Sequence, residues 1–273
     1  MKSEPTTERI IAENQLSNRE SYLLYLIHLA TYKYALSFVD GKNVLDYGCG
    51  SGYGTALISD YCTKVTGVDI SSEAVRYARS HYNAPNLSYL QIEPAEIALL
   101  PFPDSSFDVV LSFQVIEHVQ NVSVYLQELN RVLAPGGQII IATPDRSTRL
   151  FPFQKPWNIW HLREYTMDEL YATLSTCFSD VNVLQTGGSP DILRIELKRV
   201  KRLKWLTLPF TLPFIPDAIR KACLIFIKNL RYSLFLNSRN AYEPSFDDTA
   251  ISISSQEECS VDLVAVASKK TVA

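Results

Sequence analysis

Short apolar runs alternate with amphipathic stretches along most of the chain. We expect the apolar runs to be strands, at 42–47, 65–70, 86–92, 107–113, 138–143, 181–184 and 260–267. The amphipathic stretches predict helices, at 20–38, 53–61, from 71 onward, 121–133 and 166–178. Strands that alternate with helices are typical of an α/β fold with a doubly wound, mostly parallel sheet, here of seven strands.

Residues 190–250 break this alternation. Within them, segment 198–239 has ten Lys or Arg and one acid, Asp217, so its net charge is +9. The net charge of the whole chain is −3, so the rest of the chain has a net charge of −12. Three prolines exclude one continuous helix, although 218–236 can form a helix whose charges are all positive. The segment is a lid over an acceptor, a cap packed on the sheet, or a patch that lies on an anionic membrane surface. A basic RNA-binding face is less favoured because of the apolar content.

The bulk properties limit the class of protein. A length of 273 residues suits one domain, so we expect a single unit over 1–273. Within it we expect an N-terminal helical segment at 1–40 and a basic, aromatic-rich helical insertion at 190–250, before the last strand. The net charge does not favour a nucleic-acid partner. No apolar run is long enough to span a membrane. The five cysteines form no C-x-x-C pair, so zinc and redox motifs are unsupported. Their odd number, and the polar residues 1–14, which do not resemble an export signal, lead us to expect a cytoplasmic location, with membrane association left open.

A glycine-rich loop, VLDYGCGSGYG, occupies 44–54 and joins an expected strand to a helix. Glycines allow a tight turn and let a ligand lie against bare backbone, and the helix N-terminus offers free N–H groups to a carboxylate. A side chain at Gly48 or Gly50 is therefore expected to occupy the ligand's space. The dinucleotide fingerprint G-x-G-x-x-G fails because its third glycine is Tyr53, which disfavours an NAD oxidoreductase.

This loop resembles the first motif of class I S-adenosylmethionine-dependent methyltransferases. The resemblance implies S-adenosyl-L-methionine as the cofactor, with its methionine part held by the loop through Asp46, Gly48 and Gly50. It also implies that Asp69, 23 residues after Asp46, binds both ribose hydroxyls and that Ile70 covers the adenine. A helix cap is the alternative explanation of Asp69.

Two further segments match the family. Glu96, in the stretch EIALLPF, aligns with an acid that contacts the adenine amino group, and Glu93 is the alternative in a second register. The segment 112–119, SFQVIEHV, corresponds to the part of the family that lines the methyl-donor pocket, which places Phe113 beside the cofactor.

Methyl transfer requires an aligned acceptor and removal of its proton. His118 is the best candidate for the general base, because an imidazole titrates near neutrality, and Glu117 is expected to face the acceptor with it. His161 is the candidate partner. The alternatives are that His118 only holds its loop and that His161 is a packed residue at the rim.

Two narrower resemblances concern the acceptor. Ubiquinone O-methyltransferases and small-RNA 2′-O-methyltransferases hold a divalent metal with E-x-x-E-H, in some members with a later His, but here Gln114 replaces the first carboxylate. That loss weakens a magnesium site, so we predict a metal-free His118/His161 pair. The segment 161–166, HLREYT, resembles methyltransferases found with glycan-assembly enzymes. We expect O-methylation of a small-molecule or glycan acceptor, with a quinone-type phenol or a catalytically inactive cofactor-binding scaffold as alternatives.

Overall fold

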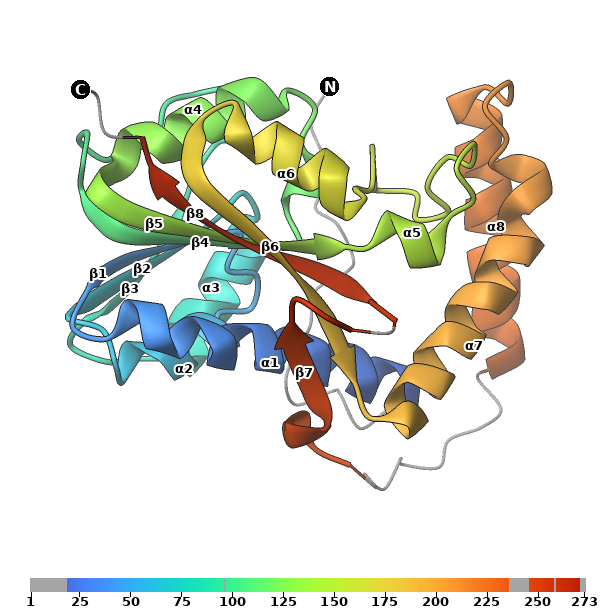
Figure 1. Ribbon diagram of the computed structural model, residues 1–273, viewed down its shortest axis with the longest axis horizontal. Coiled ribbons are helices and arrows are strands. Elements are labelled where there is room, and N and C mark those ends of the chain that lie inside the picture. The colour runs from blue at the N-terminus through green and yellow to red at the C-terminus, as the bar shows by residue number, and fades with distance from the viewer. Residues whose placement is uncertain (1–18, 96, 236–245, 258, 271–273) are drawn as a thin grey trace.

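The computed structural model describes residues 19–95, 97–235, 246–257 and 259–270, and the side chains of 230–235 are left aside. One eight-stranded sheet runs through the molecule (Figure 1). Its strands are β1 (Asn43–Tyr47), β2 (Lys64–Asp69), β3 (Leu87–Gln91), β4 (Phe107–Phe113), β5 (Leu133–Pro144), β6 (Phe178–Gly188), β7 (Ile251–Ser254) and β8 (Asp262–Lys269). The residues 1–14 considered above and Glu96 lie outside the described part.

The strand order is β3-β2-β1-β4-β5-β8-β6-β7. Strands β1 to β5 pair in parallel, whereas β8 runs antiparallel to both β5 and β6, and β7 is antiparallel to β6. The expected doubly wound sheet is confirmed, but with eight strands, not seven. The additional strand, β7, has only four residues and pairs on one side, so it leaves too short a pattern to detect. The order reverses between β1 and β4, where such sheets bind ligands beyond the carboxyl ends of the strands.

Helices cover both faces of the sheet (Figure 1). On one face lie α1 (Arg19–Val39), α2 (Tyr53–Ser59) and α3 (Ser72–His81), and on the other α4 (Val122–Val132) and α6 (Met167–Ser175). The predicted apolar face of α4 is buried at Leu126 and Leu129. Ser71 caps α3 by accepting from the amide of Ala74, and Thr166 and Glu169 form a capping box on α6. Because of these caps, both helices begin next to the residues at which their starts were predicted, 71 and 166.

The insertion folds into two helices, α7 (Pro190–Thr207) and α8 (Asp217–Phe235), joined through the short turn η3 (Leu208–Phe210). The helix expected at 218–236 is present, whereas α7 was missed. Three prolines fall between the two helices, and Pro190 occupies the first turn of α7, where a helix tolerates it. Helix α7 packs mainly on α1 and on the short helix α5 (Arg146–Arg149), not across a face of the sheet.

The two insertion helices stand beyond the end of the sheet at which β5 leads into α5 (Figure 1). This is the carboxyl end of the parallel strands, where a ligand is expected. None of the described helices has both the length and the apolar content needed to cross a membrane. That the insertion acts as a lid over the acceptor stays a prediction.

Candidate active site

The glycine loop leaves β1 with three residues in the left-handed region, Gly48, Gly50 and Gly52. A Cβ on Gly48 would collide with Val115, and one on Gly52 would lie 2.6 Å from the Cβ of Ala78. A Cβ on Gly50 would meet no atom within 4 Å. Gly50 thus borders open space in the way expected of a ligand-binding position, whereas at Gly48 the obstacle to a side chain is the protein itself.

Asp46 is only 1% exposed, and its carboxylate is directed into the protein. It accepts hydrogen bonds from Thr55 Oγ1 at 2.6 Å and from Tyr32 Oη at 3.1 Å, which ties α1 and α2 to the end of β1. Burial raises the pKa of Asp46 to about 6, although the two hydroxyl donors oppose the shift. In this arrangement Asp46 shapes the loop, and direct contact with the cofactor stays a prediction.

Asp69 ends β2 and holds two backbone amides. Its Oδ2 accepts from the Gly50 amide at 3.0 Å and its Oδ1 from the Ser71 amide at 2.8 Å. The predicted ribose-binding acid is therefore joined to the glycine loop, 19 residues away in sequence. The next residue, Ile70, is an exposed aliphatic side chain, as expected of a cover for the adenine. These positions agree with the predicted order of cofactor contacts but do not test them.

Glu96 and Phe113 are the other two residues predicted to contact the cofactor. Glu96 lies outside the described residues, and its alternative, Glu93, is exposed just after β3. Phe113 ends β4 but is almost fully buried, with its ring 4.9 Å from that of Tyr32 in an edge-on contact. Phe113 thus belongs to the core beneath α1, which leaves little of its side chain to contact a ligand.

The segment after β4 begins with Gln114, whose backbone φ is 56°, and continues into the turn η2 (Ile116–His118). Glu117 is fully buried, and its Oε2 accepts from Thr143 Oγ1 at 3.0 Å. Its other oxygen, Oε1, is buried without a partner among the described residues. The backbone carbonyl of Glu117 accepts from the amide of Leu162, which brings the segment containing His161 against η2.

His118 and His161 lie edge-on, with ring centroids 4.9 Å apart. The Nδ1 of His118 is 3.1 Å from the carbonyl of Trp160, and the Nδ1 of His161 is 2.8 Å from Glu164 Oε1. Carbonyl and carboxylate oxygens only accept, so each Nδ1 must donate, and each neutral ring keeps its lone pair on Nε2. The structure thus brings together all three predicted catalytic residues, because the ligand atoms of Glu117, His118 and His161 lie within 4.8 Å of one another.

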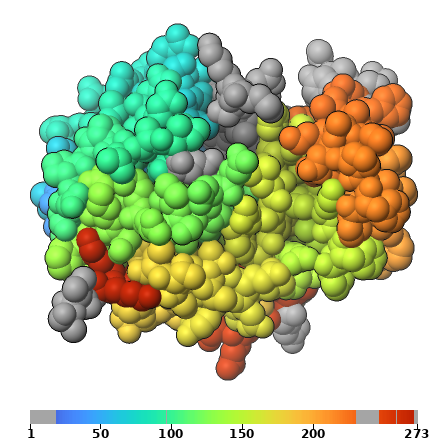
Figure 2. Space-filling model, turned by 90° about the horizontal axis from the view of Figure 1, so that it is seen from above, coloured from blue at the N-terminus to red at the C-terminus, as the bar shows by residue number. Residues whose placement is uncertain are grey.

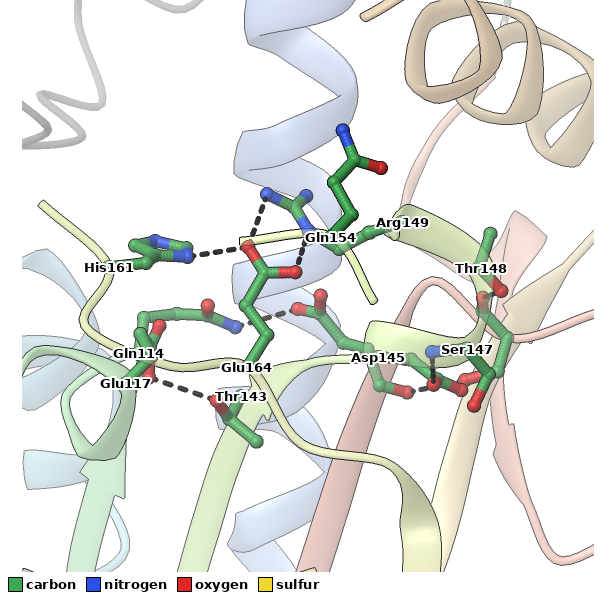
Figure 3. A network of polar contacts seen from close by, with 12 residues as sticks. Gln114, Glu117, Thr143, Asp145, Ser147, Thr148, Arg149, Gln154, His161 and Glu164 are labelled. Atoms are coloured by element: carbon green, nitrogen blue, oxygen red, sulfur yellow. Dashed lines mark hydrogen bonds and ion pairs between the residues drawn. The ribbon is translucent and has the colours of Figure 1, made fainter. Parts of the chain in front are cut away.

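A buried ion pair supports His161 (Figure 3). Glu164 accepts from Arg149 Nε at 3.0 Å as well as from His161. Burial would raise the pKa of Glu164, but the Arg149 guanidinium and the His161 hydrogen bond outweigh it and lower the pKa to about 2. The guanidinium itself lies 4.3 Å from the centre of the Trp157 ring. His161 is therefore a buried residue held by a charged partner, and not a residue at the rim.

Other polar residues of the site have no local sequence signal. Gln114 Nε2 donates to Asp262 Oδ2 at 2.7 Å, so the residue in place of the family's first carboxylate is engaged with β8 (Figure 3). Burial, reinforced by the carboxylates of Glu117 and Glu196, raises the pKa of Asp262 to about 7. Arg149 and Asp262 were missed because their partners lie far away in the chain. Arg163 Nη2 donates to the carbonyl of Gln120 at 3.0 Å.

Comparisons with known proteins agree on one family. Residues 45–141 match the family model of the methyltransferase domain. A protein of Mycolicibacterium smegmatis, named a probable S-adenosylmethionine-dependent methyltransferase, is 37% identical over 154 residues, 56% of this chain and 58% of that protein. A ubiquinone biosynthesis O-methyltransferase of Albidiferax ferrireducens is 34% identical over 116 residues, 41% of this chain and 45% of that protein.

The fold comparison points the same way. The crystal structure of a S-adenosylmethionine-dependent methyltransferase of Thermotoga maritima superposes with a TM-score of 0.55 at 19% identity, covering 92% of this chain and 95% of that one. At this identity the likeness concerns the fold alone, and the chain spans only about half the length of the two curated relatives. Residues 45–141 therefore match a methyltransferase domain of the S-adenosylmethionine-dependent kind, with S-adenosylmethionine as its cofactor.

Proposed function

We propose that the chain transfers the methyl group of S-adenosylmethionine to an oxygen of a small-molecule or glycan acceptor. The observation that carries the proposal is the pair His118 and His161, whose rings lie edge-on with centroids 4.9 Å apart and whose Nδ1 atoms are both engaged, which leaves Nε2 to accept a proton. A hydroxyl acceptor must lose a proton as it is methylated, and an imidazole held in one tautomer is suited to take it. The similarity to an O-methyltransferase supports transfer to oxygen.

In the proposed reaction the acceptor oxygen forms a bond to the methyl carbon while the bond from that carbon to sulfur breaks. S-adenosylmethionine supplies the methyl group on a positively charged sulfur, and its product leaves neutral, so no group of the protein needs to neutralise a leaving anion. Asp69 and the Gly50 backbone would bind the donor. His118 or His161 would take the acceptor proton on Nε2, while the hydrogen bonds to Glu164 and Trp160 keep both rings in place.

The test is turnover measured as S-adenosylhomocysteine, with acceptors screened by mass spectrometry of the methylated product. His118→Ala and His161→Ala should each lower turnover by about 10²–10⁴-fold, the usual contribution of a general base. Calorimetry should show that S-adenosylmethionine binding survives. His81→Ala, an exposed histidine on α3, is the matched control and should keep full activity. Wild-type protein that binds the cofactor but never yields product would favour the inactive scaffold instead.

A divalent cation on Glu117, His118 and His161 is a second candidate, favoured by the buried, unpartnered Oε1 of Glu117. One carboxylate oxygen and two imidazole nitrogens are an established ligand set. Two atoms that bind one cation through bonds of about 2.1 Å lie at most about 4.2 Å apart. The candidate ligand atoms here lie within 4.8 Å of one another, so they would have to move slightly closer together to bind a cation. The cation would lower the pKa of a bound hydroxyl. Calorimetric titration with Zn²⁺, Mn²⁺ and Mg²⁺ separates this candidate from the metal-free pair, and Glu117→Gln should abolish any heat of binding.

Two classes of acceptor, a glycan and a quinone-type phenol, fit the proposed reaction. The HLREYT segment favours a glycan, whereas the similarity to a ubiquinone biosynthesis enzyme favours a quinone-type phenol. The two are distinguished by the mass and fragmentation of the methylated product. All five cysteines are free, in keeping with the cytoplasmic location proposed from their number, and fractionation of cells would test that location.

A further inference from the structure

The outer face of the insertion helices is unusually apolar. Six of its side chains are exposed: Trp205, Leu206, Phe214, Ile219, Ile225 and Phe226. Phe214 and Phe226 are 76% and 68% exposed. Figure 2 shows the orange helical segment at one end of the molecule. Large exposed apolar side chains that gather on one element mark an interaction surface.

Helix α8 buries Arg220 together with Leu224 and exposes apolar side chains elsewhere on its surface. Arg220 is 4% exposed, and its guanidinium is directed inward, where it donates to the carbonyl of Pro156 at 2.7 Å. Ile219, Ala222 and Phe226 recur at the spacing of one helix face and are all exposed. A helix that only packed on the protein would leave no second apolar face exposed. Among the described residues, nothing covers this second apolar face of α8.

The same two helices carry several cations. Lys198, Lys201, Arg202 and Lys204 on α7 and Lys221 on α8 have no acidic partner among the described residues. The acids nearby are already engaged: Glu196 pairs with Arg199, and Asp217 pairs with Lys155 and Arg220. The face therefore combines apolar side chains with uncompensated positive charge, a pattern that fits anionic lipid headgroups above acyl chains.

A hollow of about 310 Å³ lies between α5 and α7 beside these cations. It is lined mainly by Phe151, Val200, Lys201, Lys204 and Trp205. The Nζ of Lys204 lies 4.3 Å from the centre of the Phe151 ring. Apolar walls next to two ammonium groups suit the junction between a lipid headgroup and its chains.

We propose that the outer face of α7, η3 and α8 docks on an anionic lipid bilayer, with Phe214, Phe226 and Trp205 entering the interface. The helices lie on the surface and do not cross it. This docking would hold the carboxyl end of the sheet close to the lipid, and it does not depend on which acceptor is methylated.

The test is co-sedimentation of the full chain with phosphatidylcholine vesicles that contain about 30% phosphatidylserine. We expect binding that weakens as salt rises and that is absent from pure phosphatidylcholine. The triple variant Lys201→Gln, Arg202→Gln, Lys221→Gln should bind on the order of 100-fold more weakly, since each cation near an anionic surface contributes about fivefold or more. The matched control removes the same charge away from the insertion, with Lys42→Gln and Lys64→Gln before β1 and at the start of β2 and Arg76→Gln on α3, and should bind as wild type.

The apolar contribution has its own pair of variants. Phe214→Ser with Phe226→Ser should weaken vesicle binding at least tenfold, whereas Tyr61→Ser with Tyr171→Ser removes two exposed aromatics elsewhere and should have no effect. Brominated lipids should quench the fluorescence of wild type more than that of Trp205→Phe. Circular dichroism checks that every variant is folded.

Several results would overturn the proposal. Wild type that stays in the supernatant, or a charge control that binds as weakly as the triple variant, would show that this face has no affinity of its own for the bilayer. A dimer in light scattering that Phe226→Ser dissociates would assign the face to a second copy of the chain. Retention of single-stranded RNA without vesicle binding would assign it to nucleic acid.

Discussion

The two parts of the candidate site, a proposed donor side and a proposed acceptor side, are built in opposite ways. On the donor side, Gly48, Gly50 and Asp69 fall within 22 residues, and the bonds that matter are to backbone amides. On the acceptor side, Gln114, Arg149 and Asp262 come from segments up to 148 residues apart and meet through side chains. The family match at 45–141 includes the whole donor side but ends before Arg149 and His161.

The difference reflects what each side has to do. A cofactor shared by a family can be bound by a short loop whose backbone conformation depends on a few glycines. An acceptor that differs between members requires side chains of particular chemistry, and these are placed by packing among distant elements. The donor side is therefore expected to be sensitive to backbone changes and the acceptor side to the loss of buried charge.

The largest expected effect concerns the acceptor side. Arg149→Ala leaves the carboxylate of Glu164 buried without its counterion and should cost about 3–5 kcal/mol of unfolding free energy, measured in urea. Arg146→Ala, in the same short helix, removes a partly exposed pair with Glu169 and should cost about 1 kcal/mol or less. Equal losses would mean that the buried ion pair does not stabilise this side.

The next effect belongs to the donor side and depends on pH. The pKa of Asp46 is raised from 3.8 to about 6 in the folded protein, so its contribution to stability is complete below pH 3.8 and is lost as the pH rises through about 6. The shift of about two units corresponds to about 3 kcal/mol. The stability of Asp46→Asn relative to wild type should rise by this amount between pH 4 and pH 7 in urea unfolding. Asp60→Asn, which changes an exposed acid at the end of α2, is the matched control for the loss of one carboxylate.

A smaller effect concerns cofactor affinity. Asp69→Ala should weaken S-adenosylmethionine binding by about 1.5–3 kcal/mol, roughly 10–150-fold in Kd, because it removes a charge-assisted acceptor. Glu73→Ala makes the same change of charge one turn into α3 and should leave the affinity unaltered in calorimetry. A weak effect at Asp69 would show that this residue serves only as the loop anchor and cap.

The smallest effect separates backbone strain from ligand space. Gly50 and Gly41 both have positive φ and open surroundings, so Gly50→Ala and Gly41→Ala should each cost about 1–2 kcal/mol of stability. Only Gly50→Ala should also lower cofactor affinity, by about tenfold or more. If both variants bind the cofactor as wild type does, the space beside Gly50 is not part of the donor site.

Much of the fold was predictable because the parallel strands are short, apolar and separated by clear turns. β4 was predicted to the residue, and the predicted helix starts, 71 and 166, are the residues that cap α3 and α6. The strand β7 and the helix α7 were missed, since a four-residue edge strand has no distinctive pattern and the prolines beside α7 suggested a longer break.

The sequence by itself determined the donor side, because glycines, an acid after the second strand and their spacing dictate a backbone shape that needs no distant partner. It also placed His118 and His161 as candidates. Only the tertiary structure decided that the two rings meet, that Glu164 and Arg149 hold one of them, and that Gln114 is bound to Asp262. These contacts depend on how β4, β5, β8 and α5 pack together. No local sequence pattern predicts which buried charged groups will pair after these elements have packed.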